Sequence, residues 1–404
     1  MAKRALEGLK VLEFCWAAAG PIAGLYLAHH GARVIRIESM HRTDVLRVVA
    51  PYKDDIPGVN RAGLWGCYNS NKLGMALNLS HPKAIDVVKR LIIWSDIVGE
   101  SFAPGVMEKL GFGYNELKKI KPDIIMYSSS SQGQTGPHSN SPAYGVHLVS
   151  LSGFTHFTGW PDRVAAQPYA VYTDFISPRF LLVAILAAVD YHHRTGEGQY
   201  IDISQLEGGV YFILPAILDY TLNKRVETRA GNKCSCAAPH GAYPCKGDDR
   251  WCVIGIFNDE EWNALCQVMG NPDWAEKQEF ATLLGRKKNE EELNKRIGEW
   301  TRNFTAEEVM EKLQTTGVPA GVVKNAADVQ DDAQLAYRHH FWQLDHPEMG
   351  MINYEGPGFI LSKTPAEIKM PSPLLGEHTE YICREILGMS DEEFIDLLGQ
   401  GVFE

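Results

Sequence analysis

Short apolar segments alternate with amphipathic ones along the first third of the chain. Leu9–Phe14 predicts a buried strand, Ile22–His29 a helix that Gly31 ends, and Arg33–Glu38 a strand. Further segments continue this pattern, with strands expected at Met75–Leu79, Ile97–Gly99 and Ile124–Ser128 and helices at His81–Ser95 and Tyr114–Ile120. Because a strand, a short helix and a second strand normally form a right-handed parallel unit, this half predicts an open, doubly wound α/β sheet.

The pattern then changes to long apolar helices and a polar connection. Pro178–His193 predicts a buried helix, Gln199–Ser204 a strand and Gln205–Asn223 a second apolar helix. The following stretch is polar and carries Gly and Cys, which is typical of a linker. Short strands and helices follow, and the last expected helix is His378–Leu387. We therefore expect the N-terminal part of a large domain at 1–223, a linker at 224–238, a small α+β domain at 239–330 and a tail at 331–404.

Composition and charge exclude several classes of function. The chain has 404 residues, too many for one ordinary core, and its 22% charged residues are typical of a globular enzyme. The net charge of −11 argues against nucleic-acid or membrane binding but permits a local basic pocket. The longest apolar run, Phe180–Val189, is too short to span a membrane, and Lys3, Arg4 and Glu7 leave no apolar signal region. We expect a soluble, cytoplasmic protein without a disulfide framework.

Common cofactor and nucleophile motifs are missing from the sequence. The turn after the first strand reads Ala19-Gly20-Pro21, so a nicotinamide or flavin site of the G-x-G-x-x-G type is unsupported. There is no G-x-x-x-x-G-K-[ST] motif, no H-E-x-x-H and no G-x-S-x-G. The sequence therefore does not support an ATP-driven ligase of the P-loop type.

Two other sites can be drawn from the side chains. A zinc site would use four possible ligands, Cys234, Cys236, His240 and Cys245. We favour a thiol-bearing linker instead. Ser129 or Ser130 as a nucleophile lacks a base at a recognisable spacing, so we expect these serines in a solvated loop after a strand.

Seven short segments are informative as an ordered set. They are Ala19-Gly20-Pro21 with Gly31–Glu38, Asn69–Lys72, Glu100–Val106, Gln132–Pro137, Thr195–Gln199, Gly317–Gly321 and Pro373–Thr379. In this order they resemble the family III CoA-transferases of the formyl-CoA transferase and carnitine CoA-transferase type, a family that includes the α-methylacyl-CoA racemases. The resemblance implies a Rossmann-like large domain made from the N-terminal half and the C-terminal tail. It also implies an inserted smaller domain and an interlocked, ring-shaped dimer.

The same resemblance implies transfer of CoA without ATP or metal, through attack of a carboxylate on the thioester. The matching residue is Asp174, which leads into the apolar helix expected from Pro178. A carboxylate at such a position is poorly hydrated and so more nucleophilic. The alternative role is helix capping, by Asp174 or by Ser177.

The resemblance also implies which residues bind coenzyme A. The matching positions are Ser39, Asn69, Asn71 and Lys72, then Ser101, Phe102 and Ala103 on the adenine side, Lys109 for a phosphate, and Ala143 and Tyr144 near the sulfur. Ala18 and Ser39 stand where the family often has Gln and Arg, so Arg36, Arg42 or Arg47 is expected to supply the missing cation. The alternative is that Lys72 and Lys109 are surface lysines and that Phe102 packs in the core.

Three functions remain open. The first is CoA transfer from succinyl-CoA to a carboxylic acid, with 2-benzylsuccinate as the expected acceptor because the overall pattern is most similar to the catalytic subunits of the benzylsuccinate branch. Carnitine-type and short dicarboxylate acceptors are alternatives. The second is racemisation of a 2-methylacyl-CoA, although the racemase His-Asp segment reads Tyr144-Gly145 here and the nearest imidazole is His147. The third is one subunit of a heteromer that pairs a catalytic with a non-catalytic chain, instead of a homodimer; because Asp174 is present, this would be the catalytic chain.

Overall fold

The computed structural model describes residues 4–169 and 171–404, which form two compact units. The large unit comprises the residues up to Thr155, Gln167–Glu227 and Gln334–Glu404. The small unit comprises His156–Ala166 and Thr228–Ala333. Its first segment, His156–Ala166, lies within the part of the sequence that the pattern assigns to the large domain.

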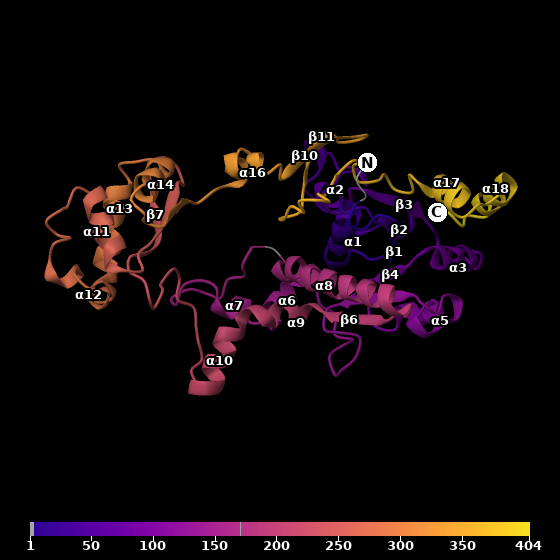
Figure 1. The fold of residues 1–404 in the computed structure, drawn as a ribbon, viewed down its shortest axis with the longest axis horizontal. Helices are drawn as coiled ribbons and strands as arrows, with labels where there is room; N and C mark the ends of the chain where they lie inside the picture. Colours follow the sequence, from indigo (N-terminus) through magenta and orange to yellow (C-terminus); the bar gives the residue numbers. More distant parts are fainter. Residues whose placement is uncertain (1–3, 170) are drawn as a thin grey trace. The chain divides into compact units, whose positions relative to one another are not determined.

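A six-stranded sheet lies in the large unit, with all neighbours parallel and the order β3-β2-β1-β4-β5-β6 (Figure 1). Its strands are β1 (Lys10–Phe14), β2 (Arg33–Glu38), β3 (Lys72–Ala76), β4 (Ile97–Glu100), β5 (Ile125–Ser130) and β6 (Tyr200–Ser204). The strand order reverses at β1, which lies between β2 and β4. The predicted doubly wound α/β sheet is confirmed.

Helices connect and cover these strands. Those before β6 are α1 (Ala19–His29), the 3-10 turns η1 (Val45–Arg47) and η2 (Lys53–Asp55), α2 (Gly63–Asn69), α3 (Ala84–Trp94), α4 (Val106–Lys109), α5 (Tyr114–Ile120), α6 (Gly145–Leu151), α7 (Phe154–Phe157) and α8 (Tyr172–Thr195). Those after it are α9 (Gln205–Val210), η3 (Tyr211–Ile213), α10 (Leu214–Asn223), α16 (Ala333–Tyr337), α17 (Thr379–Tyr381), the π-helix η5 (Ile382–Ile386) and α18 (Asp391–Gly399).

Successive residues of the central strands enter two different cores. On β1, Val11 packs with residues of α1 and α8, whereas Leu12 packs with residues of α3 on the other face. On β4, Ile97 likewise belongs to the same core as Val11, and Val98 to the same core as Leu12. Because neighbouring residues of a strand point to opposite faces, burial on both faces gives the near-continuous apolar segments seen in the sequence.

Helix α8 begins six residues before the predicted start at Pro178. Its first residue is Tyr172, and Pro178 lies inside the helix. A proline within a helix removes the hydrogen bond to the carbonyl four residues earlier, here that of Asp174, and this made Pro178 resemble a first helical residue. The buried side chains of Thr173, Ile176 and Ser177 anchor this extra turn in the unit, so tertiary packing outweighs the local cost of the proline.

Other boundaries also differ from the prediction. β3 begins at Lys72 rather than Met75, and the helix expected at Gln205–Asn223 consists of α9, η3 and α10. The tail carries an additional helix, α18, whose side chains Phe394 and Leu397 are buried. The tail also forms a hairpin of β10 (Phe341–His346) and β11 (Gly350–Glu355).

The tail covers the open edge of the parallel sheet at β3. The amide of Gly74 donates to His378 Nδ1 at 3.2 Å, and the amide of His378 donates to the Gly74 carbonyl at 2.9 Å. Two residues further along β3, the amide of Ala76 donates to the Thr379 hydroxyl at 3.0 Å. These bonds satisfy edge groups that would otherwise invite pairing with another chain.

The small unit has its own core around a three-stranded antiparallel sheet, β7-β8-β9. Its elements are β7 (His240–Pro244), β8 (Trp251–Gly255), α11 (Asp259–Val268), η4 (Gln278–Phe280), α12 (Leu283–Lys288), α13 (Glu290–Thr301), α14 (Ala306–Gln314), β9 (Ala320–Val322) and α15 (Ala326–Gln330). Helices α11, α13 and α14 supply buried residues such as Trp262, Leu293 and Val309.

Helix α8 is the one helix in the described part of the chain that is long and apolar enough to cross a membrane by length and composition. It packs against α1, α6 and α9 within the large unit. Leu181, Ile185 and Val189 of α8 belong to the core on one face of the sheet, which is the placement of a core helix in a globular unit.

Candidate active site

Asp174 lies in the first turn of α8. Its amide donates to the carbonyl of Val171 at 2.8 Å, and Val171 is the capping residue, with no side-chain hydrogen bond to the helix start. Ser177 is buried inside the helix. The alternative that Asp174 or Ser177 caps a helix starting at Pro178 is therefore wrong, and the Asp174 carboxyl is available for another role.

The carboxyl group of Asp174 packs against the start of α6. A Cβ atom at Gly145 would lie 2.7 Å from Asp174 Oδ1, so only glycine allows the carboxyl to sit there. Burial raises the pKa of Asp174 to about 6. The group is then ionised at neutral pH yet poorly hydrated, which makes its oxygen more reactive toward a carbonyl carbon.

The residues just before Gly145 line the same region. Tyr144 is 78% exposed. Its amide donates to His147 Nδ1 at 3.2 Å, and the Ser131 hydroxyl donates to the Ala143 carbonyl at 3.4 Å. The Nδ1 atom of His147 is thus used to hold the start of α6. The predicted residues Ala143 and Tyr144 therefore lie beside Asp174 by their connection to Gly145.

A second group of predicted residues meets where β1 and β4 end. The Ser101 hydroxyl accepts from the Trp16 amide at 2.8 Å, and the rings of Phe102 and Trp16 pack edge to face at 6.4 Å between centroids. The exposed Arg42 guanidinium lies 4.9 Å from the Trp16 ring centroid. Ala103 follows on the exposed side. Ligands of doubly wound sheets bind at such a reversal of strand order, at the carboxyl ends of the strands.

The buried carboxyl group of Glu100 binds the backbone of this group of residues. It ends β4, and its Oε2 accepts from the amide of Phe102 at 2.7 Å. Burial raises its pKa to about 7, and the nearby carboxylates of Glu108 and Asp202 add to the rise. Lys109 lies close by in sequence at the end of α4, with an exposed side chain.

The predicted residue Lys72 is fully buried in an ion-pair cluster rather than on the surface. Its Nζ lies 2.9 Å from Glu13 Oε2 and donates to the Pro21 carbonyl at 2.8 Å and to Asn69 Oδ1 at 3.2 Å. Burial lowers the pKa of Lys72 to about 8, while Glu13 opposes the fall. The interpretation of Lys72 as a solvated surface lysine is therefore wrong.

The cluster continues to the arginines expected to replace the family's missing cation. Arg36 pairs with Glu13 and Asp44, and it donates to Asn69 Oδ1 at 3.1 Å. Arg47 makes two hydrogen bonds with Glu38, at 2.9 and 2.8 Å. Both side chains are fully buried. Of the three arginines, Arg42 alone is exposed, so it is the one free to meet a ligand.

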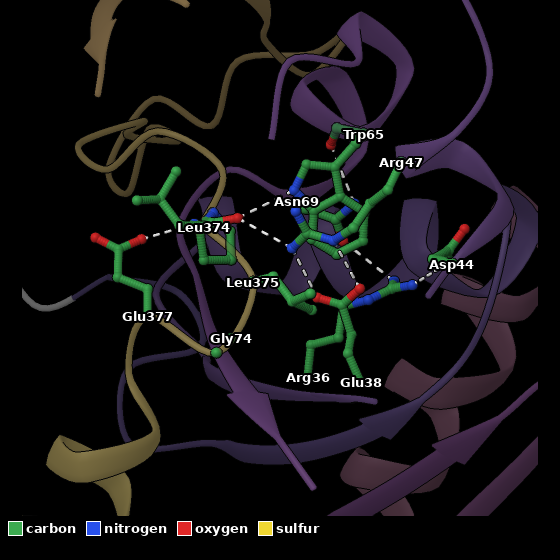
Figure 2. Close-up of polar contacts among 12 residues, drawn as sticks. Arg36, Glu38, Asp44, Arg47, Trp65, Asn69, Gly74, Leu374, Leu375 and Glu377 are labelled. Carbon is green, nitrogen blue, oxygen red and sulfur yellow. Dashed lines mark hydrogen bonds and ion pairs between the residues drawn. The ribbon is translucent and has the colours of Figure 1, made fainter. Parts of the chain in front are cut away.

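The tail completes this cluster. Arg47 lies 3.5 Å from the centroid of the Trp65 ring, and both Arg47 and the indole Nε1 of Trp65 donate to the Pro373 carbonyl (Figure 2). Asn71, another predicted residue, has a positive φ of 59°. Its side chain donates to the Glu367 carbonyl at 2.6 Å and accepts from the Lys369 amide at 2.8 Å. These contacts hold the sheet and the tail together.

Ser39 lies apart from these groups. It is half-buried after β2, and its hydroxyl donates to the Glu404 carbonyl at 3.4 Å. A contact of Ser39, Asn69, Asn71 or Lys72 with coenzyme A stays a prediction, because in the structure their polar atoms bind other parts of the chain.

The structure also shows where the residues lie that the sequence analysis rejected as a serine nucleophile and as zinc ligands. Ser129 and Ser130 lie in β5 and are buried, so the expectation of a solvated loop is wrong. Cys234 and Cys236 lie with their sulfurs 3.3 Å apart. Among residues 4–169 and 171–404, no group of three or more His, Cys, Asp or Glu side chains could hold a metal ion.

Comparison with known proteins decides the family. The sequence model of the CoA-transferase family III matches residues 6–379. The chain belongs to that family. This family III transferase is 31% identical to the succinyl-CoA–D-citramalate CoA-transferase of Chloroflexus aurantiacus, over 99% of its own length and 98% of the relative. It is also 31% identical to the succinyl-CoA:glutarate CoA-transferase of Mus musculus, over 99% and 90% of the two chains.

A solved structure agrees with the fold. The crystal structure of a CAIB/BAIF family protein from Brucella suis superposes with a TM-score of 0.88 at 27% identity, covering 95% of this chain and all of that one. The protein is thus a CoA-transferase, with an acyl-CoA and a carboxylic acid as substrates.

Several residues of the site were not predicted from the sequence. Trp16 follows the first strand directly, and an aromatic residue at a strand end is a usable signal for a ligand site. Glu13 is an acid inside an apolar strand and therefore indicates a buried cationic partner. Gly145 carries no such signal, because its importance depends on its contact with Asp174 of α8.

Proposed function

We propose that this CoA-transferase moves CoA from succinyl-CoA to a dicarboxylic acid, with Asp174 as the nucleophile. The observation that carries the proposal is the Asp174 carboxyl, which packs on Gly145 and has its pKa raised to about 6 by burial. It would be ionised at neutral pH without a full hydration shell. No specific contact favours racemase chemistry, since Tyr144-Gly145 stands at the family's His-Asp position.

The reaction would proceed through anhydride and thioester intermediates. A carboxylate oxygen of Asp174 attacks the succinyl-CoA carbonyl carbon, and the CoA thiolate leaves as a mixed anhydride forms. The thiolate then attacks the aspartyl carbonyl, so succinate leaves and CoA is bound to Asp174 as a thioester. The acceptor carboxylate attacks this thioester, so the CoA thiolate leaves again and a second anhydride forms. Attack of the thiolate on the acceptor carbonyl releases the new acyl-CoA and restores the Asp174 carboxylate.

The relatives support the choice of substrates. The names of three of them join succinyl-CoA to D-citramalate, glutarate or L-malate, and all three acceptors are dicarboxylic acids. A formyl-CoA:oxalate CoA-transferase of Rhodopseudomonas palustris is 29% identical over 98% of this chain and 97% of its own. 2-Benzylsuccinate is a dicarboxylic acid with an aromatic substituent, and none of these names includes it. We retain it as one acceptor to be tested.

The coenzyme A site would combine two groups of residues. Trp16 and Phe102 offer aromatic faces for adenine beside Ser101 and Ala103, and Arg42 and Lys109 offer cations for the phosphates. Ala143 and Tyr144 would lie along the thiol end. The buried cluster around Lys72, Asn69 and Asn71 would then act mainly by holding these elements in place, and Ser39 would have a minor role.

The assembly would be an interlocked, ring-shaped dimer of soluble, cytoplasmic subunits. One relative is named as the beta subunit of a succinyl-CoA–L-malate CoA-transferase, 30% identical over 98% of both chains, so a heteromer with a similar chain is an alternative. Because Asp174 is present, this chain would be the catalytic one in such a pair.

The proposal is tested with a panel of donors and acceptors. The protein is incubated with succinyl-CoA and, in separate reactions, glutarate, malate, citramalate, oxalate, benzylsuccinate or carnitine, and the new CoA ester is measured by mass spectrometry. We expect transfer to at least one dicarboxylic acid and none to carnitine. Deuterium incorporation at the α-carbon of a 2-methylacyl-CoA, without CoA exchange, would instead show a racemase.

A further inference from the structure

A cavity of about 270 Å³ lies inside the large unit, next to the first turn of α8. Its lining residues come from α1, α2, α8 and the segment after β11, and include Ile22, Tyr26, Tyr68, Phe175, Arg179 and Glu355. At the volume of about 30 Å³ per water in the liquid, the cavity has room for about nine water-sized groups. That space suits a small organic acid.

Arg179 supplies a cation to the wall of this cavity. It lies one helical turn after Phe175, and its Nη1 donates to the Phe175 carbonyl at 2.6 Å. Its Nη2 donates to the Tyr26 hydroxyl at 3.3 Å. A guanidinium has five N–H groups, so these two bonds fix its position and leave donors for a carboxylate.

The cavity adjoins the nucleophile. Phe175 follows Asp174 directly and forms part of the wall, and its ring packs edge to face on Tyr68 at 6.3 Å between centroids. Burial raises the pKa of Tyr68, and the charges of Cys67, Glu355 and Asp174 add to the rise while Arg179 opposes it. The Tyr68 hydroxyl therefore stays protonated and can donate a hydrogen bond. It lies close enough to Asp174 and Arg179 for both charges to affect its pKa.

Tyr68 is the wall residue that relates the two charged groups. Asp174 and Arg179 are five residues apart along α8, which is about 7.5 Å of helical rise but also about 140° around the helix axis. Their side chains therefore leave α8 in different directions, and the cavity wall contains Arg179 and Phe175 but not Asp174. The charges of both Asp174 and Arg179 act on Tyr68, so an acid with two carboxyl groups would reach past Phe175 and Tyr68, with one end at Asp174 and the other at Arg179. The remaining polar wall residues do not compete for the anion. His29 is neutral, because burial lowers its pKa to about 3, and it bonds to the Ser70 hydroxyl at 2.9 Å.

We propose that this cavity is the specificity pocket for dicarboxylic acids, in which Arg179 binds the carboxylate that does not react and Tyr68 donates a hydrogen bond to the bound acid. The proposal rests on the proposed function, because it places that acid beside Asp174. Glu355 is the one acid in the wall, and it repels the anion that Arg179 attracts. The two residues therefore have opposite effects on binding.

The test compares acceptors of equal length with one and with two carboxylates, such as valerate and glutarate. The wild-type protein and the variants Arg179→Met, Arg179→Lys, Tyr68→Phe and Glu355→Gln are assayed for kcat and KM with each acceptor, using saturating succinyl-CoA as donor. Arg194→Met is the matched control, because Arg194 lies on the same helix in an exposed pair with Asp190.

We expect Arg179→Met to lower kcat/KM for the dicarboxylate about 10- to 100-fold, mainly through KM, because charge-assisted hydrogen bonds are lost. The kcat/KM for valerate should change little. Arg179→Lys should give a smaller loss, Tyr68→Phe a few-fold loss, and Glu355→Gln a lower KM for the dicarboxylate. The control should match the wild type.

The outcomes separate this proposal from the proposed function. If the wild-type protein transfers CoA but Arg179→Met keeps its preference for the dicarboxylate, the pocket assignment is wrong and the transferase assignment stands. If the wild type transfers CoA to no acid, the proposed function itself fails. Should Arg179→Met not fold, an unchanged KM in both Arg179→Lys and Glu355→Gln would overturn the pocket on its own.

Discussion

At the scale of single residues, the Asp174 carboxyl group lies in surroundings that disfavour its ionised form. Asp174 packs on Gly145, and burial raises its pKa to about 6. A raised pKa in the folded state means that folding favours the protonated form, so ionisation of Asp174 costs stability as the pH rises from about 4 to 6. The same loss of hydration makes the carboxylate reactive.

The rate of thioester formation should therefore depend on pH through Asp174. Only the carboxylate attacks, so the rate with succinyl-CoA should rise with pH to a plateau, with a midpoint near 6. Stopped-flow or quenched-flow measurement of the first half-reaction, without acceptor, isolates this step. A midpoint near 4 would show a well-hydrated carboxyl and contradict the buried site.

Glu100 provides a second titrating group that affects stability rather than chemistry. Its folded pKa of about 7 lies above the ordinary value, so its contribution to stability is present at low pH and is lost as the pH rises from about 4.5 to 7. Glu100→Gln should stabilise the protein at pH 8 by up to about 3 kcal/mol and change little at pH 5. Melting temperatures at both pH values test this. The exposed Glu116→Gln is the control, and equal melting temperatures of wild type and Glu100→Gln at pH 8 would refute the prediction.

The sequence was sufficient to predict the role of some of these residues but not their contacts. Asp174 was predicted as the nucleophile from its place in an ordered set of motifs, but nothing near it indicated the contact with Gly145. Lys72 was predicted as a ligand-binding or surface residue because its partner Glu13 lies far away in the sequence. A charge on an apolar strand indicates burial only when its counter-ion is known.

At the scale of elements, the contact between α6 and α8 positions the nucleophile. Thr173 donates to the Gly145 carbonyl at 3.5 Å, and Asp174 occupies the space where a side chain at Gly145 would lie. The sequence predicted an apolar helix here but not its first turn, since Pro178 is a common first helical residue. The packing of Thr173 and Ile176 decides where α8 begins.

Gly145→Ala tests this contact. The added methyl group would lie 2.5 Å from Val171 Cβ and 2.7 Å from Asp174 Oδ1, so it must displace the start of α8 together with Asp174. We expect kcat of the folded protein to fall at least about 10-fold, because small misplacements of reacting groups are costly. Gly399→Ala in α18 is a matched control, since no atom lies within 4 Å of the added group. Equal kcat values for Gly145→Ala and the wild type would show that α6 does not position the nucleophile.

At the scale of the whole molecule, the large unit depends on both ends of the chain. The alternating pattern of the sequence was sufficient to predict the doubly wound sheet, because each strand and helix is a local signal. The tail carries no comparable signal. Its bonds to Trp65 and Arg47 use the Pro373 carbonyl, a group that any residue would supply. Its side-chain bonds to β3 come from His378 and Thr379, whose partners are backbone amides far away in the sequence. Only the resemblance to the family predicted that the tail belongs to the large domain.

Removal of residues 371–404 should therefore unfold the large unit. The truncated chain would lose the cover of the β3 edge and the buried side chains Phe394 and Phe403. We expect aggregation and no cooperative melting by circular dichroism. The variant His378→Ala with Thr379→Val keeps the chain but removes two acceptors of β3 amides, so it should fold with a lower melting temperature. A truncated protein that melts like the full chain would contradict this role of the tail.

The most direct test of the central claim is to trap CoA on Asp174. The protein is mixed with succinyl-CoA without acceptor, treated with borohydride or hydroxylamine, digested, and analysed by peptide mass spectrometry, with Asp174→Asn as the control. The account predicts a donor-dependent modification on the peptide that contains Asp174, mapped to that residue, and none in a folded Asp174→Asn protein. A modification at another residue, or transfer by Asp174→Asn at the wild-type rate, would contradict it.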